Sequence, residues 1–173
     1  MNDMTHDKIA TGRRAFLACF SAAAISGLAW RWASPPAAAA VAGLPTPYQL
    51  PDVEWRRRLS PQAYAVLRHA ATEAPWSSPL NNEHGKGRFL CAGCALPLFE
   101  STTKFDSGTG WPSFYASIPR AVGRSVDRSL GEARTEVHCA RCAGHLGHVF
   151  DDGPAPTGLR YCMNGVALRF ARG

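Results

Sequence analysis

The chain has 173 residues, of which 46% are hydrophobic and 18% charged, and a formal net charge of +6. Residues 41–173 suit one domain, and they contain neither internal repeats nor a long apolar segment. In this part of the sequence the arginines are scattered, residues 56–58 being the only run, and no basic stripe alternates with aromatic residues, so nothing indicates nucleic-acid binding.

The first 40 residues have the parts of an export signal. Arg13 and Arg14 precede Phe16 and an apolar run over residues 16–30, and the segment ends in alanines at 37–40. A basic start, a short apolar core and small residues are typical of a secretory signal, and paired arginines are typical of the bacterial twin-arginine (Tat) type. We expect residues 1–40 to direct export to the periplasm, with cleavage within 38–42.

The alternative is an uncleaved membrane anchor that leaves the protein facing the periplasm. The apolar run of 15 residues is shorter than the ~20 residues that span a bilayer. We therefore expect the chain to meet the membrane only transiently, through its signal.

Residues 41–51 carry three prolines and are predicted to form an extended linker before a domain at 52–171. From residue 41 onward, 15 lysines and arginines stand against 11 aspartates and glutamates, a net charge of +4.

A helix is predicted to begin after Ser60. Ser60 and Pro61 suit the cap and the first position of a helix, and apolar residues then recur at helical spacing up to Ala70.

Beyond Pro75 the pattern changes to short strand-like pieces separated by glycine, proline, asparagine and aspartate. The pieces lie at residues 88–90, 104–105, 136–138, 148–150 and 166–170. Many short strands with turn residues between them predict a mainly β, antiparallel domain behind a short N-terminal helical arm.

Four cysteines form two pairs with two residues between the partners, Cys91 with Cys94 and Cys139 with Cys142. Each pair makes a tight loop that can present two sulfurs to one tetrahedral zinc ion. The 44 residues between the pairs imply that a subdomain is inserted between two loops that meet in space.

Two alternatives to a four-cysteine zinc site stay open at this point. One is a pair of disulfides, since export usually means an oxidising compartment. The other is a compact metal site made of Cys139, Cys142, His145 and His148. Spacing favours the four-cysteine site, and Tat export carries folded proteins, so zinc could bind in the cytoplasm first.

Cys162 has no partner cysteine. Cys19 leaves with the signal, so the mature chain holds five cysteines, and an odd cysteine in an exported protein calls for an explanation. His145 and His148 lie nearby in sequence. Cys162 is therefore the candidate for a chemically reactive thiol.

Four segments stand out together: CAGC at 91–94, FDSGTGWPSF at 105–114, HLGHVFDDGP at 145–154 and RYCMN at 160–164. In this order they resemble the B class of methionine-(R)-sulfoxide reductases, and the resemblance covers about residues 52–171. It implies two small antiparallel β-sheets with a structural zinc away from the active site. It also implies thiol-dependent reduction of methionine R-sulfoxide, free or within proteins, which would repair oxidised exported proteins.

The resemblance implies four catalytic residues. Cys162 would attack the sulfoxide sulfur as a thiolate, and His148 would be the acid that protonates the sulfoxide oxygen. His145 would lie beside it, and Asn164 would orient the site by a hydrogen bond. Histidine suits the role because its pKa lies near the working pH.

Two further residues would bind the substrate. Trp111 is similar to the family's aromatic residue that packs against the methyl group of the substrate, and an indole face offers a favourable contact to a sulfur-bearing group. Arg160 would add positive charge near Cys162.

The chain departs from a common family pattern at Thr109, where many members carry a second, resolving cysteine. Attack leaves Cys162 as a sulfenic acid, which a second thiol must reduce. Because no mature cysteine other than Cys162 lies outside the predicted zinc pairs, we expect an external thiol, such as a thioredoxin-like partner, to reduce it directly. We expect a monomer, since the sequence has no heptad or apolar helical seam.

Overall fold

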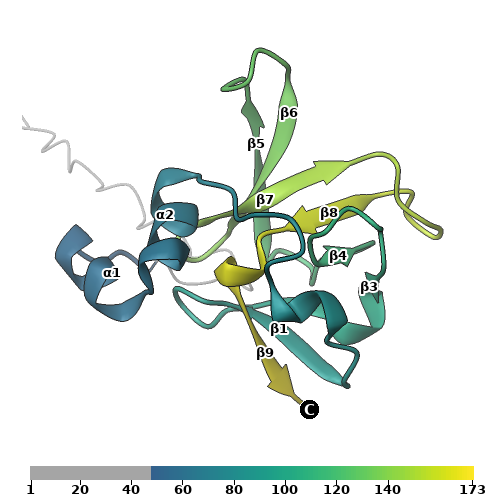
Figure 1. Cartoon of the computed structure of the whole chain (residues 1–173), viewed down its shortest axis with the longest axis horizontal. Helices are drawn as coiled ribbons and strands as arrows, with labels where there is room; N and C mark the ends of the chain where they lie inside the picture. The colour runs from purple at the N-terminus through teal and green to yellow at the C-terminus, as the bar shows by residue number, and fades with distance from the viewer. Residues whose placement is uncertain (1–47) are drawn as a thin grey trace, which may run out of the picture. The chain divides into compact units, whose positions relative to one another are not determined.

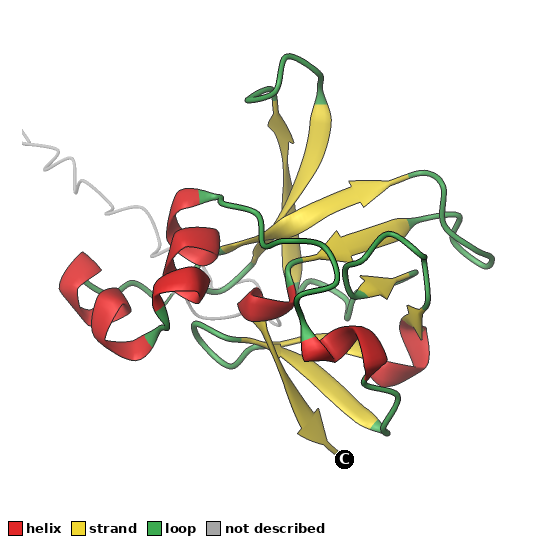
Figure 2. Ribbon diagram, in the orientation of Figure 1, coloured by secondary structure: helices red, strands yellow, loops and turns green. Residues whose placement is uncertain are grey.

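The computed structural model describes residues 48–173, so the predicted export signal and most of the predicted linker lie outside the described residues. Figures 1 and 2 show two helices beside two antiparallel β-sheets. This confirms the predicted mainly β fold. No helix in the described part is long and apolar enough to cross a membrane.

The elements follow one another in this order: α1 (Asp52–Arg58), α2 (Pro61–His69), η1 (Pro79–Asn82), β1 (Gly87–Cys91), β2 (Pro97–Glu100), η2 (Ser101–Thr103), β3 (Lys104–Phe105), β4 (Ser113–Phe114), β5 (Val122–Asp127), β6 (Arg134–Cys139), β7 (His145–Phe150), β8 (Arg160–Met163), η3 (Gly165–Ala167) and β9 (Leu168–Arg172).

The predicted helix is α2. The Ser60 hydroxyl accepts a hydrogen bond from the backbone N–H of Ala63, and Pro61 occupies the first turn. Helix α1 was not anticipated, because its seven residues bury only Trp55 and so give almost no helical periodicity. It ends in three arginines, whose positive charges interact favourably with the negative C-terminal end of the helix dipole.

The strands pair in two sheets. The small sheet has the order β2-β1-β9, and the large sheet has the order β3-β4-β8-β7-β6-β5. All pairings are antiparallel. In Figure 1 the β5–β6 hairpin extends beyond the other strands of the large sheet.

The large sheet divides its side chains between a core face and a site face, because successive residues of a strand point to opposite sides. Val137, Tyr161 and Met163 are buried in the core. Their neighbours Glu136 and Cys162 point the other way and are only partly buried. The polar candidates for chemistry therefore gather on one face of this sheet.

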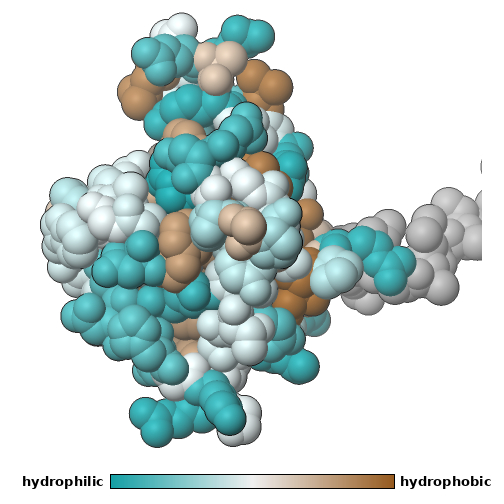
Figure 3. Space-filling model, turned by 90° about the vertical axis from the view of Figure 1, so that its right-hand side faces the viewer, coloured by the Kyte–Doolittle hydropathy of each residue, from teal (hydrophilic) through white to brown (hydrophobic). Residues whose placement is uncertain are grey.

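Large apolar side chains that remain exposed are scattered over the described surface, at Val53, Trp76, Val126 and Leu130. On the face turned to the viewer in Figure 3, hydrophobic residues form small separate areas among hydrophilic ones. Single exposed apolar residues are normal on a protein surface and do not mark an interface. That the protein is a monomer stays a prediction.

Candidate active site

The two cysteine pairs meet in space as one cysteine cluster, made of Cys91, Cys94, Cys139 and Cys142. All four thiols are buried and free, and their sulfur atoms lie within 4.8 Å of one another. The Sγ atoms of Cys91 and Cys142 are 3.6 Å apart, and those of Cys94 and Cys139 are 3.5 Å apart. A disulfide needs about 2.05 Å, whereas zinc–sulfur bonds of about 2.3 Å in a tetrahedron place sulfurs about 3.8 Å apart. The cluster therefore fits a metal ion and not two disulfides.

The cluster joins the two sheets. Cys91 is the last residue of β1 in the small sheet, and Cys139 is the last residue of β6 in the large sheet. Two arginines brace the loops: Arg141 donates to the carbonyl of Cys94 (3.1 Å) and Arg68 to the carbonyl of Cys142 (3.0 Å). A metal ion here would link the end of β1 in the small sheet to the end of β6 in the large sheet.

A separate pocket of about 190 Å³ lies at Cys162. It brings together four of the predicted site residues, since its lining consists of Thr72, Trp111, Arg134, Gly147, His148, Phe150, Cys162 and Asn164. Cys162 and His148 are register partners on β8 and β7, so their side chains emerge side by side on the same face. His145 and Arg160 do not line this pocket.

His145 nevertheless lies on the same face as His148, although residues three apart on a regular strand point to opposite sides. A register shift in the β6–β7 pairing, between Val137 and His138, brings His145 back to the site face. The two imidazole rings are 5.4 Å apart. Gly147 is required between them, because a side chain there would come within 2.1 Å of the carbonyl oxygen of Cys162.

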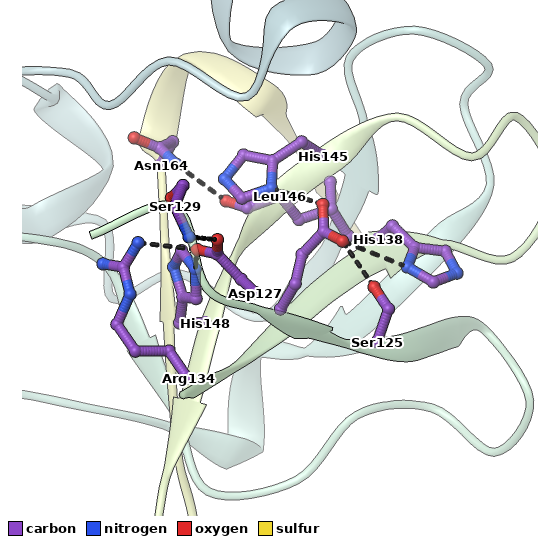
Figure 4. Close-up of polar contacts among 10 residues, drawn as sticks. Ser125, Asp127, Ser129, Arg134, His138, His145, Leu146, His148 and Asn164 are labelled. Carbon is purple, nitrogen blue, oxygen red and sulfur yellow. Dashed lines mark hydrogen bonds and ion pairs between the residues drawn. The ribbon is translucent and has the colours of Figure 1, made fainter. Parts of the chain in front are cut away.

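Each histidine is bonded to a carboxylate from the β5–β6 hairpin (Figure 4). The Nδ1 atom of His145 lies 2.8 Å from Oε1 of Glu136, and the Nε2 atom of His148 lies 2.8 Å from Oδ2 of Asp127. Burial lowers the pKa of His148 below its usual value, and the hydrogen bond to Asp127 offsets part of this. The alternative metal site of two cysteines and two histidines does not form among the described residues, because Cys139 and Cys142 group with Cys91 and Cys94 and not with the histidines.

Asn164 lines the pocket, but its amide bonds to backbone and not to a histidine ring. The Oδ1 atom accepts from the N–H of Glu73 (2.9 Å), and Nδ2 donates to the carbonyl of Leu146 (3.0 Å). The Asn164 amide thus links strand β7, at Leu146, to the segment that contains Glu73. Its predicted role in orienting the site stays a prediction, and its hydrogen bonds go to the backbone of this wall.

Trp111 is half-buried, and its Nε1–H donates to the carbonyl oxygen of Glu73 (3.2 Å). The next residue, Pro112, is buried and accepts a hydrogen bond from the N–H of Met163 (3.0 Å). The indole is therefore fixed at one edge, which leaves its apolar surface to form a wall of the pocket.

Arg160 points to the site face two residues before Cys162, but its guanidinium is occupied by Asp152. Nε and Nη2 donate to the two carboxylate oxygens of Asp152, both at 2.8 Å, and the group stacks over the ring of Phe150. The hydrogen bond to Asp152 raises the pKa of Arg160, and the neighbouring Cys162 adds to the rise. Asp152 therefore pairs the positive charge of Arg160, and both predicted roles of Arg160, adding charge near Cys162 and binding substrate, stay predictions.

Thr109 lies directly beside Cys162. Its Oγ1 atom is 3.8 Å from Sγ of Cys162, and it also hydrogen-bonds the hydroxyl of Ser107 (2.8 Å). In the described part of the chain, the other four cysteines all belong to the cysteine cluster.

Four charged residues that shape the site were not predicted from the sequence: Glu73, Asp127, Arg134 and Glu136. Glu73 is buried, and its carboxylate accepts from the N–H groups of Gly165 (2.6 Å) and Val166 (2.9 Å) just after the Cys162 strand. The only sequence signal for Glu136 is its place in a short alternating strand. Glu73 has none, because its partners lie more than 90 residues away.

Taken together, these features define a class: a small β protein whose two sheets meet at a four-cysteine cluster that fits a metal ion, with a fifth, separate cysteine beside a histidine in a pocket. Residues 59–172 match the family model described as the SelR domain, and the chain belongs to this family.

Three relatives illustrate the similarity, each named peptide methionine sulfoxide reductase MsrB. The protein from Bradyrhizobium diazoefficiens is 57% identical over 119 residues, covering 68% of this chain and 86% of the relative. The protein from Leifsonia xyli is 57% identical over 121 residues, covering 69% and 87%. The protein from Agrobacterium fabrum is 52% identical over 120 residues, covering 69% and 89%. The resemblance to the B-class reductases is thereby confirmed.

Proposed function

We propose that this protein reduces methionine R-sulfoxide to methionine, free or within proteins, with Cys162 as the nucleophile. The observation that carries the proposal is the position of Cys162. It is a half-buried thiol in a pocket walled by an indole and a histidine. The family membership supports the same reaction.

The chemistry requires a thiolate and a proton donor in one pocket. A sulfoxide sulfur is only weakly electrophilic until its oxygen is protonated or hydrogen-bonded, and His148 is the residue proposed to supply that proton. Attack by the Cys162 thiolate then transfers the oxygen: the S–O bond of the sulfoxide breaks and methionine leaves. Cys162, oxidised by two electrons, becomes a sulfenic acid whose hydroxyl carries the proton.

Regeneration is proposed to use an external thiol. One thiol condenses with the sulfenic acid of Cys162, releasing water and forming a mixed disulfide, and a second thiol breaks that disulfide and restores Cys162. A hydroxyl at Thr109 and the burial of the other four sulfurs in the cysteine cluster support this route. A thioredoxin-like protein is the proposed donor.

The cysteine cluster is proposed to hold a structural Zn²⁺ ion. Its four buried sulfurs, spaced to suit tetrahedral coordination, support this assignment. None of them lines the pocket of Cys162. Zinc would therefore stabilise the fold and take no part in the chemistry.

One assay tests the reaction. The wild-type protein and Cys162→Ser are given R- and S-sulfoxide substrates separately, with dithiothreitol as reductant and with the bound metal measured. We expect the wild type to convert the R form alone, and Cys162→Ser to lose activity while keeping its metal and fold. Activity on the S form alone, or an active Cys162→Ser protein, would refute the proposal.

The cellular role proposed is the repair of oxidised exported proteins in the periplasm. The paired arginines ahead of an apolar run support it. Replacing Arg13 and Arg14 by lysine in the full chain is expected to keep the protein in the cytoplasm of a bacterium competent for twin-arginine transport. Unchanged periplasmic recovery on cell fractionation would contradict this role.

A further inference from the structure

We propose that Asp127 is a positioning residue for His148, holding its imidazole in the tautomer and orientation that proton transfer at Cys162 needs. This inference rests on the proposed function and extends it. Cys162, His148 and Asp127 would then act as a nucleophile, an acid and the group that orients the acid.

The carboxylate of Asp127 is fixed from three sides. Oδ2 accepts from Nε2 of His148 (2.8 Å) and from Nη2 of Arg134 (2.6 Å), and Oδ1 accepts from the backbone N–H of Ser129 (2.8 Å). Figure 4 shows these groups converging on the carboxylate at the end of the β5–β6 hairpin. The side chains of Asp127 and His148 are only 19% and 13% exposed, so water competes weakly for the bond between them.

The bond decides which ring nitrogen takes part in chemistry. An ionised carboxylate can only accept hydrogen bonds, so Nε2 of His148 must carry a proton in the bond to Asp127. The remaining nitrogen, Nδ1, is then the atom that gains and loses a proton. Asp127 therefore assigns Nδ1 of His148 to proton transfer.

The position of Asp127 follows from strand register. Asp127 is the last residue of β5 and pairs with Arg134, the first residue of β6. Both point to the site face, and β6 places them next to His148 on β7. The hairpin is thus part of the site, although 21 residues separate Asp127 from His148.

The electrostatic surroundings of His148 give the proposal a pH signature. The titratable or charged groups facing it from the packed strands are Asp127 on β5, Arg134 and Glu136 on β6, His145 on β7 and Cys162 on β8. Burial and Arg134 favour the neutral imidazole, while Asp127 favours the charged one. Removing the charge of Asp127 must therefore lower the pKa of His148 further.

The test is the pH profile of a single turnover, measured as methionine released from R-sulfoxide without reductant. For Asp127→Asn we expect the rate at pH 7.5 to fall about tenfold or more, and the pH above which the rate declines to move downward. Asp127→Glu should recover part of the loss. The matched control is Glu100→Gln, whose carboxylate pairs with exposed Arg88 on the small sheet and which should leave the profile unchanged.

A double variant separates positioning from a purely structural role. If Asp127 acts through His148, then Asp127→Asn should cost nothing further in a His148→Gln background, because residues acting as a unit are not additive. Independent losses that multiply, or an Asp127→Asn profile that superimposes on the wild type, would overturn the proposal.

Nitrogen NMR of the imidazole tests the same idea without any reaction. In the wild-type protein we expect His148 to be protonated at Nε2 when neutral, and we expect this preference to be lost in Asp127→Asn. A wild-type ring protonated at Nδ1 overturns the positioning role even where the variants fold poorly. Absence of R-sulfoxide reduction by the wild type, with the expected tautomer present, would instead refute the proposed function.

Discussion

Replacing Thr109 by cysteine should convert this protein from the proposed direct reduction by an external thiol to an intramolecular disulfide mechanism. The Thr109 hydroxyl lies 3.8 Å from Sγ of Cys162, and two sulfurs must approach to about 2.05 Å to bond. Thr109 lies in the turn between β3 and β4, outside any strand, so the backbone can close this gap of less than about 2 Å. The sulfenic acid formed at Cys162 would then be attacked from within the chain.

The size of the effect follows from the loop that the bond would close. Positions 109 and 162 are 53 residues apart, and a cross-link over this length restricts the unfolded chain enough to stabilise the fold by about 4 kcal/mol. For a domain of this size, the melting temperature should rise by roughly 10 °C or more. The gain must disappear when the bond is reduced.

The assay compares wild type, Thr109→Cys and a control, Thr102→Cys, which adds a cysteine at an exposed site outside the pocket. After one turnover without reductant, mass spectrometry should show an added oxygen on Cys162 in the wild type and the control. Thr109→Cys should instead lose two hydrogens and melt at the higher temperature. A wild-type disulfide between Cys162 and another cysteine, or no disulfide in Thr109→Cys, would refute the reasoning.

Three further predictions concern the metal, the substrate wall and pH. Cys91→Ser should lose the bound metal and several kcal/mol of unfolding free energy, measured by metal analysis and urea titration; full stability without metal would contradict a structural site. Trp111→Ala should raise KM for R-sulfoxide about 10- to 100-fold, from the loss of roughly 1.5–3 kcal/mol of apolar contact, whereas an unchanged KM would place the methyl group elsewhere. Hydrogen bonds from the backbone and hydroxyl of Ser129, and then from His148, hold the pKa of Asp127 well below its usual range. Stability from Asp127 is therefore present above its ordinary pKa of about 3.9 and lost as pH falls through the lower native value. Urea midpoints across pH 2–7 should show this loss in the wild type and not in Asp127→Asn; identical curves would argue against it.

Local signals in the sequence predicted the parts of the fold that depend on neighbouring residues. The cap at Ser60 begins α2 as expected. The predicted pieces at 88–90, 104–105, 136–138 and 148–150 all lie within strands, while the piece at 166–170 begins instead as the short helix η3. Capping and alternation act over a few residues, so they are visible along the chain.

Features that depend on strand register could not be predicted from the sequence. Residues three apart on a strand should face opposite ways, and only the register shift at Val137 and His138 sets His145 and His148 on one face. Asn164 illustrates the same limit, since its partners are backbone atoms of segments 18 and 91 residues away. No local pattern records which carbonyl a distant strand presents.

By itself, the sequence determined the residue types on which the chemistry rests: two cysteine pairs with metal-ligand spacing, a fifth thiol at Cys162 and a threonine at position 109. The tertiary structure alone decided which of them meet. Pairing of β6, β7 and β8 sets His148 beside Cys162, the hairpin brings Asp127 to His148, and the β3–β4 turn sets Thr109 against the thiol. The physical reason is that a strand's side-chain direction and neighbours are set by hydrogen-bonded register with distant strands, which no short stretch of sequence contains.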